Sequence, residues 1–305
     1  MASEATNEDL KPYAALLAVQ FFFGSLPVIG KTVLAVIPSL SLVGFRVGIA
    51  AVVLAAFQIF RRRIWLEDAS DYIKLAILSL FGVVLNQILF IGGLAHTKAS
   101  NTSLLAVTIP IFTLTIGWLI GKERLYGLKV AGIALAAAGV LILIDPRSAS
   151  FSSETTVGDL MIVLNSLAFG IYVATSKETV TRNGAFRSMM WVFVFASIVC
   201  VPLGLFSFPA VDPASITPYI WLRILYISVF ATAAPYLLNA WALARVSPAT
   251  LAVFIYLQPM IGFIFAVIYL GERIDLNFVL ATCLIFSGLF LVLRQRRTTP
   301  LAPRP

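Results

Sequence analysis

The chain has 305 residues and a formal net charge of +8, with 60% hydrophobic but only 12% charged residues. This balance excludes an ordinary water-soluble domain and indicates a protein that folds in lipid. The positive charge does not indicate a nucleic-acid partner, because the basic residues gather near the ends of long apolar runs.

Ten apolar runs are long enough to cross about 30 Å of hydrocarbon as helices, which takes roughly 20 residues each. A transmembrane barrel would instead show strands of about ten residues with alternating character. We therefore expect an all-α polytopic membrane protein whose spans, in chain order, cover residues 12–36, 39–60, 72–95, 99–120, 126–144, 157–177, 187–208, 216–243, 247–270 and 275–293. The acidic start MASEATNEDLK precedes no small-residue cleavage site, so we expect the first helix to be retained.

The distribution of Lys and Arg predicts the orientation of these spans. With ten crossings both termini lie on one side, and 16 of the 22 basic residues fall there, against five on the other side and Arg46 inside a span. Basic loops stay in the cytoplasm, so both termini are expected there. The lipid bilayer, and not nucleic acid, is the expected partner of this charge.

A repeat divides the chain into two halves of five spans. Phe23-Gly24 and Lys31 recur 146 positions later, and Glu123, Pro110 and Gly139 recur 149 positions later. Because five is odd, the second copy enters the membrane from the opposite face, which is the inverted-repeat design of many secondary transporters. The expected divisions are a tail 1–11, a first repeat 12–145, an outer linker 146–156, a second repeat 157–294 and a basic tail 295–305.

The residues that break or end the spans are candidates for hinges and gates. Lysines at span ends either anchor the helix by reaching to water or control access to the interior. His96 is either a cap at the outer end or a titratable gate. We expect hairpins of spans three-four and eight-nine to bend near their prolines. The gating and hinge candidates are Gly24, Pro27, Lys31, His96, Pro110, Gly170, Lys177 and Pro259.

The chain lacks the residue groups that catalysis would need. GSLPVIGKT at 24–32 has five residues between its glycines, where a phosphate-binding loop needs four, and it lies in an expected helix. There is one histidine, and the acidic residues fall in the tail, the loops or the span ends. The two cysteines lie in apolar spans without metal-ligand spacing. We predict no catalytic, cofactor or metal site, and hence no enzyme.

Polar and aromatic side chains within the spans point to a substrate cavity between the halves. An unpartnered polar group is costly in lipid, so such residues line a cavity or bond a neighbouring helix. They concentrate in spans one, three, four, six, eight and nine, and Arg46 either pairs with carbonyl or acidic groups or meets an anionic substrate. The candidates are Gln20, Phe23, Ser25, Arg46, Asn86, Gln87, Thr108, Asn165, Tyr172, Tyr236, Asn239, Trp241, Tyr256 and Gln258.

The duplicated five-span unit, Arg46 in the second span and the GKER and GER segments at 121–124 and 271–273 resemble the drug/metabolite transporter superfamily. The chain is similar to its ten-helix EamA-type exporters, among them the YddG-like amino acid exporters. The resemblance implies a secondary carrier in the bacterial inner membrane that exports amino acids, with aromatic or other neutral ones as candidates, and related metabolites by alternating access. A channel-like facilitator and a multidrug exporter of cationic compounds are the alternatives. We expect a monomer, with an oligomer left open.

Overall fold

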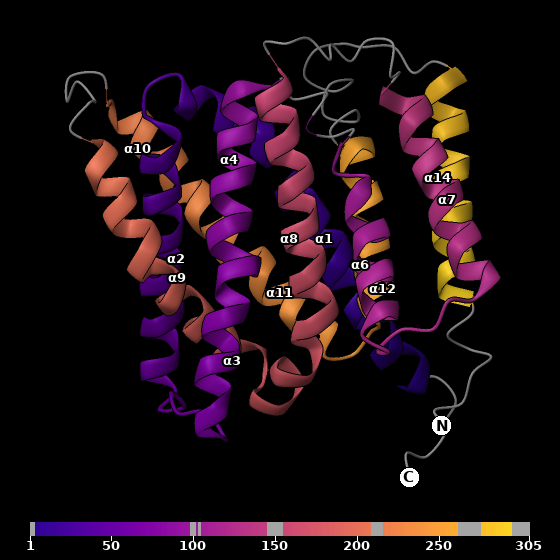
Figure 1. Ribbon diagram of the computed structural model, residues 1–305, viewed down its shortest axis with the longest axis horizontal. Coiled ribbons are helices and arrows are strands. Elements are labelled where there is room, and N and C mark those ends of the chain that lie inside the picture. The colour runs from indigo at the N-terminus through magenta and orange to yellow at the C-terminus, as the bar shows by residue number, and fades with distance from the viewer. Residues whose placement is uncertain are drawn as a thin grey trace.

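The protein is described from a computed structural model that covers residues 4–97, 102, 105–144, 155–208, 216–261 and 276–294. Within these ranges every regular element is helical, and the helices pack with roughly parallel axes as a bundle that is more than one helix deep (Figure 1). The elements are α1 (Glu4–Leu34), α2 (Ser39–Phe60), α3 (Ala69–Ser79), η1 (Leu80–Leu85), α4 (Asn86–His96), α6 (Thr108–Leu119), α7 (Gly127–Ile144), α8 (Thr156–Asn183), α9 (Ala185–Ser207), α10 (Pro218–Ser228), η4 (Val229–Ala233), α11 (Ala234–Leu243), α12 (Pro248–Val253), η5 (Phe254–Tyr256) and α14 (Leu276–Arg294).

These helices confirm the expected all-α membrane fold. Six of the described helices are long and apolar enough to cross a membrane, and four shorter apolar helices cover parts of the other expected spans. The third and eighth spans are each continuous through a π-helical turn, as α3–η1–α4 and α10–η4–α11. Most of the expected outer linker, residues 262–270 of the ninth span and the tail 295–305 lie outside the described residues, and the domain boundaries stay predictions.

Equivalent helices of the two halves run in opposite directions through the bundle (Figure 1). In Figure 1, α1 rises from the lower side to the upper side, whereas its counterpart α8 descends, and α2 and α9 are likewise reversed. The helix α1 begins and the helix α14 ends at the lower side of this view. We call the lower face, where α1 begins, the terminal face, and the upper face the distal face.

Several contacts join residues that occupy equivalent places in the two halves. Gln87 and Tyr236 stand 149 positions apart, and the Gln87 Nε2 donates to the Tyr236 hydroxyl at 3.1 Å. The hydroxyl of Tyr256 donates to the carbonyl of Val107, also 149 positions away, at 3.0 Å. Only residues on the pseudo-two-fold axis can touch their own counterparts. The axis therefore passes through the centre of the bundle, as expected for inverted repeats.

Glycines allow the helices of opposite halves to approach closely. A methyl group on Gly44 of α2 would come within 2.8 Å of the Cα of Gly204 on α9. The helices α7 and α14, the last spans of the two halves, also approach closely. A methyl group on Gly132 of α7 would come within 2.7 Å of the carbonyl oxygen of Gly288 on α14. Small residues at helix contacts are the main means of tight packing in lipid, where burial from water provides no driving force between helices.

Candidate functional site

A cavity lies at the centre of the bundle, beside the Gln87–Tyr236 contact. About 80 Å³ of it is open to a water-sized sphere, so the cavity is narrow in this conformation. Its walls come from both halves, with α1, α2, α4 and residues near α6 on one side and α8, α11 and residues near η5 on the other. The lining residues are Gln20, Phe23, Leu26, Arg46, Asn86, Gln87, Phe90, Thr102, Ala106, Ile109, Ile162, Asn165, Phe169, Tyr236, Asn239, Ile255 and Gln258.

Tyr236 is the centre of the polar network in this cavity. Its hydroxyl lies 2.7 Å from Asn86 Oδ1 and 2.9 Å from the carbonyl oxygen of Gly82, and it accepts from Gln87. A phenol has a single proton, so it donates to one of these two oxygens at a time. Its ring meets Phe23 and Phe169 edge to face, at centroid distances of 6.1 and 6.5 Å. Phe23 of α1 and Phe169 of α8 are repeat counterparts. The first span of each half therefore packs a phenylalanine against the Tyr236 ring.

Amide side chains extend this network to the neighbouring helices. Gln258 Nε2 donates to Gln20 Oε1 at 2.8 Å, which joins the ninth span to the first. Asn165 Nδ2 donates to the carbonyl of Asn86 at 2.8 Å, which joins α8 to α4. Asn239 also lines the cavity, and its Oδ1 is buried without a hydrogen-bond partner among the described residues. The cavity therefore offers mostly neutral amide groups, one of them with a free acceptor.

Arg46 is the one charged side chain among the described lining residues, and it is only 1% exposed. Its Nε donates to Thr232 Oγ1 at 2.9 Å and its Nη2 donates to the carbonyl of Ala231 at 3.2 Å. Both acceptors belong to η4, so the arginine joins the first half to the second. Nη1 is buried and has no hydrogen-bond partner in the described part of the chain. A buried unsatisfied donor is rare and costs about 1–3 kcal/mol, so it calls for an explanation.

The two π-helical turns provide backbone oxygens for these contacts. A π-helical turn changes the hydrogen-bond ladder of its helix, which leaves carbonyl groups for other donors, and such turns are common at functional sites. The Gly82 carbonyl in η1 accepts from Tyr236, and the Ala231 carbonyl in η4 accepts from Arg46. The turns begin at Leu80 and Val229, which are 149 positions apart, so the repeat preserves this distortion.

Nine of the 14 predicted cavity residues line this space, and five lie elsewhere. Thr108 donates to the Leu105 carbonyl of its own helical turn, and Tyr256 to the Val107 carbonyl. The other five lie outside the cavity lining and contact other groups. The nine are Gln20, Phe23, Arg46, Asn86, Gln87, Asn165, Tyr236, Asn239 and Gln258, and the five are Ser25, Thr108, Tyr172, Trp241 and Tyr256.

The other three of these five also have local partners. Ser25 Oγ lies 3.1 Å from the Tyr226 hydroxyl. The Tyr172 hydroxyl lies 3.5 Å from the sulfur of Met189, and the guanidinium of Arg245 stacks on the Trp241 ring at 4.1 Å. These contacts place the three side chains in the helix packing around the cavity.

The two predicted gate lysines make equivalent contacts at opposite faces. Lys31 Nζ donates to the carbonyl of Thr97 at 3.0 Å, at the distal end of α4. Lys177 Nζ donates to the carbonyl of Val246 at 2.6 Å, just after the terminal end of α11. Thr97 and Val246 are 149 positions apart, so both lysines contact the same place in their repeats. In each half, the lysine therefore joins the first of the five spans to the end of the third span, in the order of that half.

The predicted hinge residues also form equivalent contacts between the halves. A methyl group at Gly24 would come within 3.3 Å of Ile261 Cγ2, and one at Gly170 within 2.9 Å of Phe112 Cβ. Pro110 and Pro259 lie two residues before these contacts. His96 is exposed, and its Nδ1 lies 2.8 Å from the Gly92 carbonyl, as a helix-end cap would. The Pro27 side chain lies outside the described residues.

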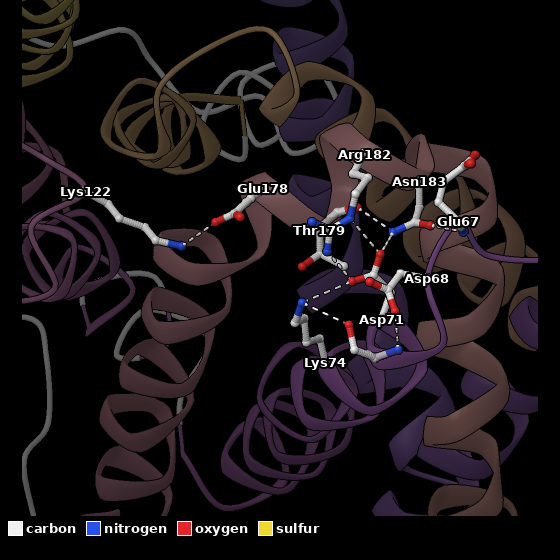
Figure 2. Close-up of polar contacts among 10 residues, drawn as sticks. Glu67, Asp68, Asp71, Lys74, Lys122, Glu178, Thr179, Arg182 and Asn183 are labelled. Atoms are coloured by element: carbon white, nitrogen blue, oxygen red, sulfur yellow. Dashed lines mark hydrogen bonds and ion pairs between the residues drawn. The ribbon is translucent and has the colours of Figure 1, made fainter. Parts of the chain in front are cut away.

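A polar network at the terminal face was not expected from the sequence. Figure 2 shows Asp71 of α3 within reach of Arg182, Asn183 and Lys74. Arg182 Nε donates to Asp71 Oδ2 at 2.8 Å, and Nη2 donates to Oδ1 of the same carboxylate. The backbone N–H of Glu67 donates to Asn183 Oδ1 at 2.9 Å. These bonds fasten the loop before α3, in the first half, to the end of α8 in the second.

Glu123, from the GKER segment, forms a second connection between the halves. It is buried and accepts from Lys129 Nζ at 2.6 Å and from the backbone N–H of Ala249 at 3.3 Å. Ala249 lies in the first turn of α12, where a carboxylate is favoured by the free N–H groups and the helix dipole. Its repeat counterpart Glu272 lies outside the described residues.

Within the described ranges, no group of three or more His, Cys, Asp or Glu side chains could hold a metal ion. The cavity instead combines amides, aromatic rings and one guanidinium.

Comparison with known proteins agrees with this architecture. The model of the EamA-like transporter family matches residues 10–145 and 156–294. An uncharacterized transporter of Archaeoglobus fulgidus is 25% identical over 81% of this chain and 85% of its own length. The uncharacterized transporter YoaV of Bacillus subtilis is 22% identical over 92% of this chain and 96% of its own. One crystal structure, 16% identical in sequence, superposes with a TM-score of 0.75 over 96% of this chain and 99% of its own, which supports the fold.

The family model covers nearly the whole chain as two copies, and the relatives are named as transporters. The predictions of a transporter and not an enzyme, and of kinship with the drug/metabolite transporter superfamily, are thereby confirmed. The chain belongs to the EamA-like transporter family.

Proposed function

We propose that this transporter exports amino acids and related small metabolites that carry a carboxylate, and that Arg46 receives the carboxylate in the central cavity. The substrate would move without ATP, by alternating access between the two faces. We further propose that the protein lies in the bacterial inner membrane as a monomer with both termini in the cytoplasm, in keeping with the excess of Lys and Arg on that side.

The observation that carries this proposal is the unpaired Nη1 of Arg46 in a cavity without an acidic residue among its described lining. A guanidinium held by two bonds to η4 keeps its third arm oriented, and arginine suits planar carboxylates. A carboxylate would satisfy Nη1 and balance the buried charge. A cationic drug would place a second positive charge beside Arg46, which disfavours the multidrug alternative.

The rest of the cavity suits a zwitterion with an apolar side chain. Asn239 Oδ1 is a buried acceptor without a partner and could receive an ammonium group. Phe23, Phe90 and Phe169 offer ring surface for an aromatic or aliphatic side chain. Neutral amides elsewhere in the cavity hydrogen-bond without selecting for charge. These features support neutral amino acids over acidic or basic ones.

The test is counterflow of labelled neutral amino acids into proteoliposomes with wild-type protein, Arg46→Gln and Arg46→Lys. Losing a hydrogen bond to a charged group costs about 1.5–3 kcal/mol, so Arg46→Gln should raise the apparent Kd roughly 10- to 150-fold. Arg46→Lys keeps the positive charge and should lose less of the affinity for substrate. Arg223→Gln, on α10 with its guanidinium stacked on Tyr219 at 4.1 Å, is the control and should transport normally.

Two outcomes would contradict the proposal. If wild-type counterflow equals that of empty vesicles for every amino acid tried, the substrate class is wrong. If Arg46→Gln binds the substrate as tightly as wild type, Arg46 is structural only. Melting temperature in detergent separates misfolding from loss of binding, because a folded variant keeps its transition while losing the shift that substrate causes.

Alternating access also distinguishes a carrier from the channel-like alternative. In a carrier, substrate loaded on the far side speeds uptake, whereas an open pore shows no such trans-stimulation. The contacts of Lys31 and Lys177 support a carrier, because they provide one breakable bond at each face. Pro110 and Pro259 are proposed as the hinges of the two hairpins.

A further inference from the structure

A groove separate from the central cavity opens at the terminal face between α3, α8 and the segment after α6. About 350 Å³ of it is open to a water-sized sphere. Its lining includes the cations Lys74, Lys122 and Arg182 and the apolar side chains Ile77, Phe81 and Ile171. None of these residues lines the central cavity, so transport of the proposed substrate does not use them.

The charged and apolar parts of the groove occupy different depths in the membrane. Lys74 lies near the start of α3, and Phe81 lies seven residues further along the span, about 10 Å deeper at 1.5 Å per residue. Arg182 lies near the end of α8, and Ile171 lies eleven residues earlier, about 16 Å deeper. The groove is therefore basic at the membrane surface and apolar toward the membrane interior.

The two lysines are available to a ligand, whereas Arg182 is not. Arg182 holds the buried carboxylate of Asp71 (Figure 2). Lys122 and Glu178 are 45% and 71% exposed, and their ion pair is long at 3.4 Å. Lys74 is 49% exposed and also lies 3.4 Å from Asp71. The Lys122–Glu178 pair is exposed on both sides and contributes about 0–1 kcal/mol, so a better anion can replace it. Asp71 is buried, but its two oxygens also accept from Arg182 and Asn183, so Lys74 can turn to another anion while this carboxylate keeps its other partners.

We propose that this groove binds an anionic phospholipid of the leaflet at the terminal face. Its phosphate would lie between Lys74 and Lys122, and an acyl chain would lie along Ile77, Phe81 and Ile171. Basic pockets between transmembrane helices are sites for acidic headgroups. A soluble anion has no use for the apolar floor, and a peptide would have to enter the hydrocarbon to reach it. The proposal needs only that the chain spans the membrane, and it is independent of the substrate.

The experiment measures lipid retained by the purified full-length protein, by native mass spectrometry after titration with phosphatidylglycerol or with phosphatidylcholine. The double variant Lys74→Gln/Lys122→Gln removes both cations, and Glu178→Gln removes the competing acid. Arg223→Gln removes a cation at the distal face and serves as the matched control. Soluble glycerol phosphate is added in a separate arm to test whether the headgroup alone binds.

Wild type should retain phosphatidylglycerol over phosphatidylcholine. Each lysine near a membrane surface contributes about 1 kcal/mol toward acidic lipid, so the double variant should bind phosphatidylglycerol about 30-fold more weakly. Glu178→Gln should bind more tightly, and Arg223→Gln should match wild type. Because Glu178→Gln has the opposite expected sign, misfolding of the double variant cannot imitate the full pattern.

Three results would overturn the lipid site. Equal retention by wild type and the double variant would mean that the lysines do not bind the headgroup. If Arg223→Gln lost as much phosphatidylglycerol binding as the double variant, the loss would reflect the net charge of the protein and not a site at these lysines. Competition by millimolar glycerol phosphate would show a site for a soluble phosphate, with no role for the acyl chain.

Discussion

Lys31 and Lys177 make equivalent hydrogen bonds at opposite faces of the protein. We therefore predict that removing one bond and removing the other shift the balance between the two open states in opposite directions. Lys31 ties α1 to the distal end of α4, and Lys177 ties α8 to the terminal end of α11. If each bond is made when its own face is closed, Lys31→Met favours opening at the distal face. Lys177→Met favours opening at the terminal face.

The size of the effect follows from the two contacts. Each is a hydrogen bond from an ammonium group to a backbone carbonyl, at 3.0 Å for Lys31 and 2.6 Å for Lys177. Bonds to charged groups contribute about 1.5–3 kcal/mol, and both sites are partly open to water, so the lower value applies. A change of about 1.5 kcal/mol shifts the ratio of the two open states roughly tenfold.

The assay is labelling of one cavity cysteine by a membrane-impermeant thiol reagent, from each face in turn. Ala106→Cys places the thiol in the cavity lining, in a background in which Cys200 and Cys283 are replaced. Lys31→Met should raise the distal-to-terminal labelling ratio about tenfold, and Lys177→Met should lower it by a similar factor. The double variant should return near the original ratio.

Arg223→Met is the matched control, because its guanidinium stacks on Tyr219 within α10 and ties no two spans together. Its labelling ratio should equal that of the parent protein. Shifts of the same sign in both lysine variants, or no shift in either, would refute the gate assignment and leave the lysines as interfacial anchors.

Two further substitutions test the cavity network and the connection at the terminal face. Tyr236→Phe keeps the ring but leaves Gln87 and Asn86 without their shared partner. It should lower the unfolding free energy by about 1–3 kcal/mol, and an unchanged melting temperature in detergent would show that water replaces the hydroxyl. Asp71→Ala leaves Arg182 and Asn183 without their common acceptor, and should destabilise by about 2–4 kcal/mol. Arg182→Ala combined with Asp71→Ala should cost less than the sum of the two single changes, and additivity would argue against the coupling.

The membrane fold could be predicted because hydropathy and length act locally. The second span was expected at 39–60, and α2 covers Ser39–Phe60, since lipid imposes one helical length on every apolar run. The inversion followed from counting spans, and a handful of matched residues located the repeat. The sequence did not reveal that Gln87 and Tyr236 are counterparts. The repeat was found by matching identical residues in the two halves, and a glutamine does not match a tyrosine.

Nine of the 14 cavity candidates meet at the cavity and five lie elsewhere, for physical reasons, while their roles stay predictions. A polar residue in a span signals that it needs a partner, but the signal does not say which face of the helix meets the cavity. Thr108 thus bonds a carbonyl of its own helical turn and Tyr256 bonds the Val107 carbonyl of the other half, while Asn239 lines the cavity. The π-helical turns were also not predicted. They change the backbone hydrogen bonds of a helix without changing the order of its apolar residues, which is the signal that predicted the spans. The burial of Asp71 depends on the corner between α8 and α9, far away in the sequence.

The two halves share a backbone plan but differ in the chemistry that they present to the cavity. Arg46 of α2 corresponds to Val192 of α9, so the pseudo-two-fold axis does not reproduce the guanidinium. Under the proposed function, the one guanidinium in the described lining would bind one carboxylate in each transport cycle. Because Arg46 bonds α2 in the first half to η4 in the second, its position does not depend on either lysine contact. If the protein works by the alternating access that we propose, the same group would hold the substrate whichever face is open, as transport around a fixed site requires.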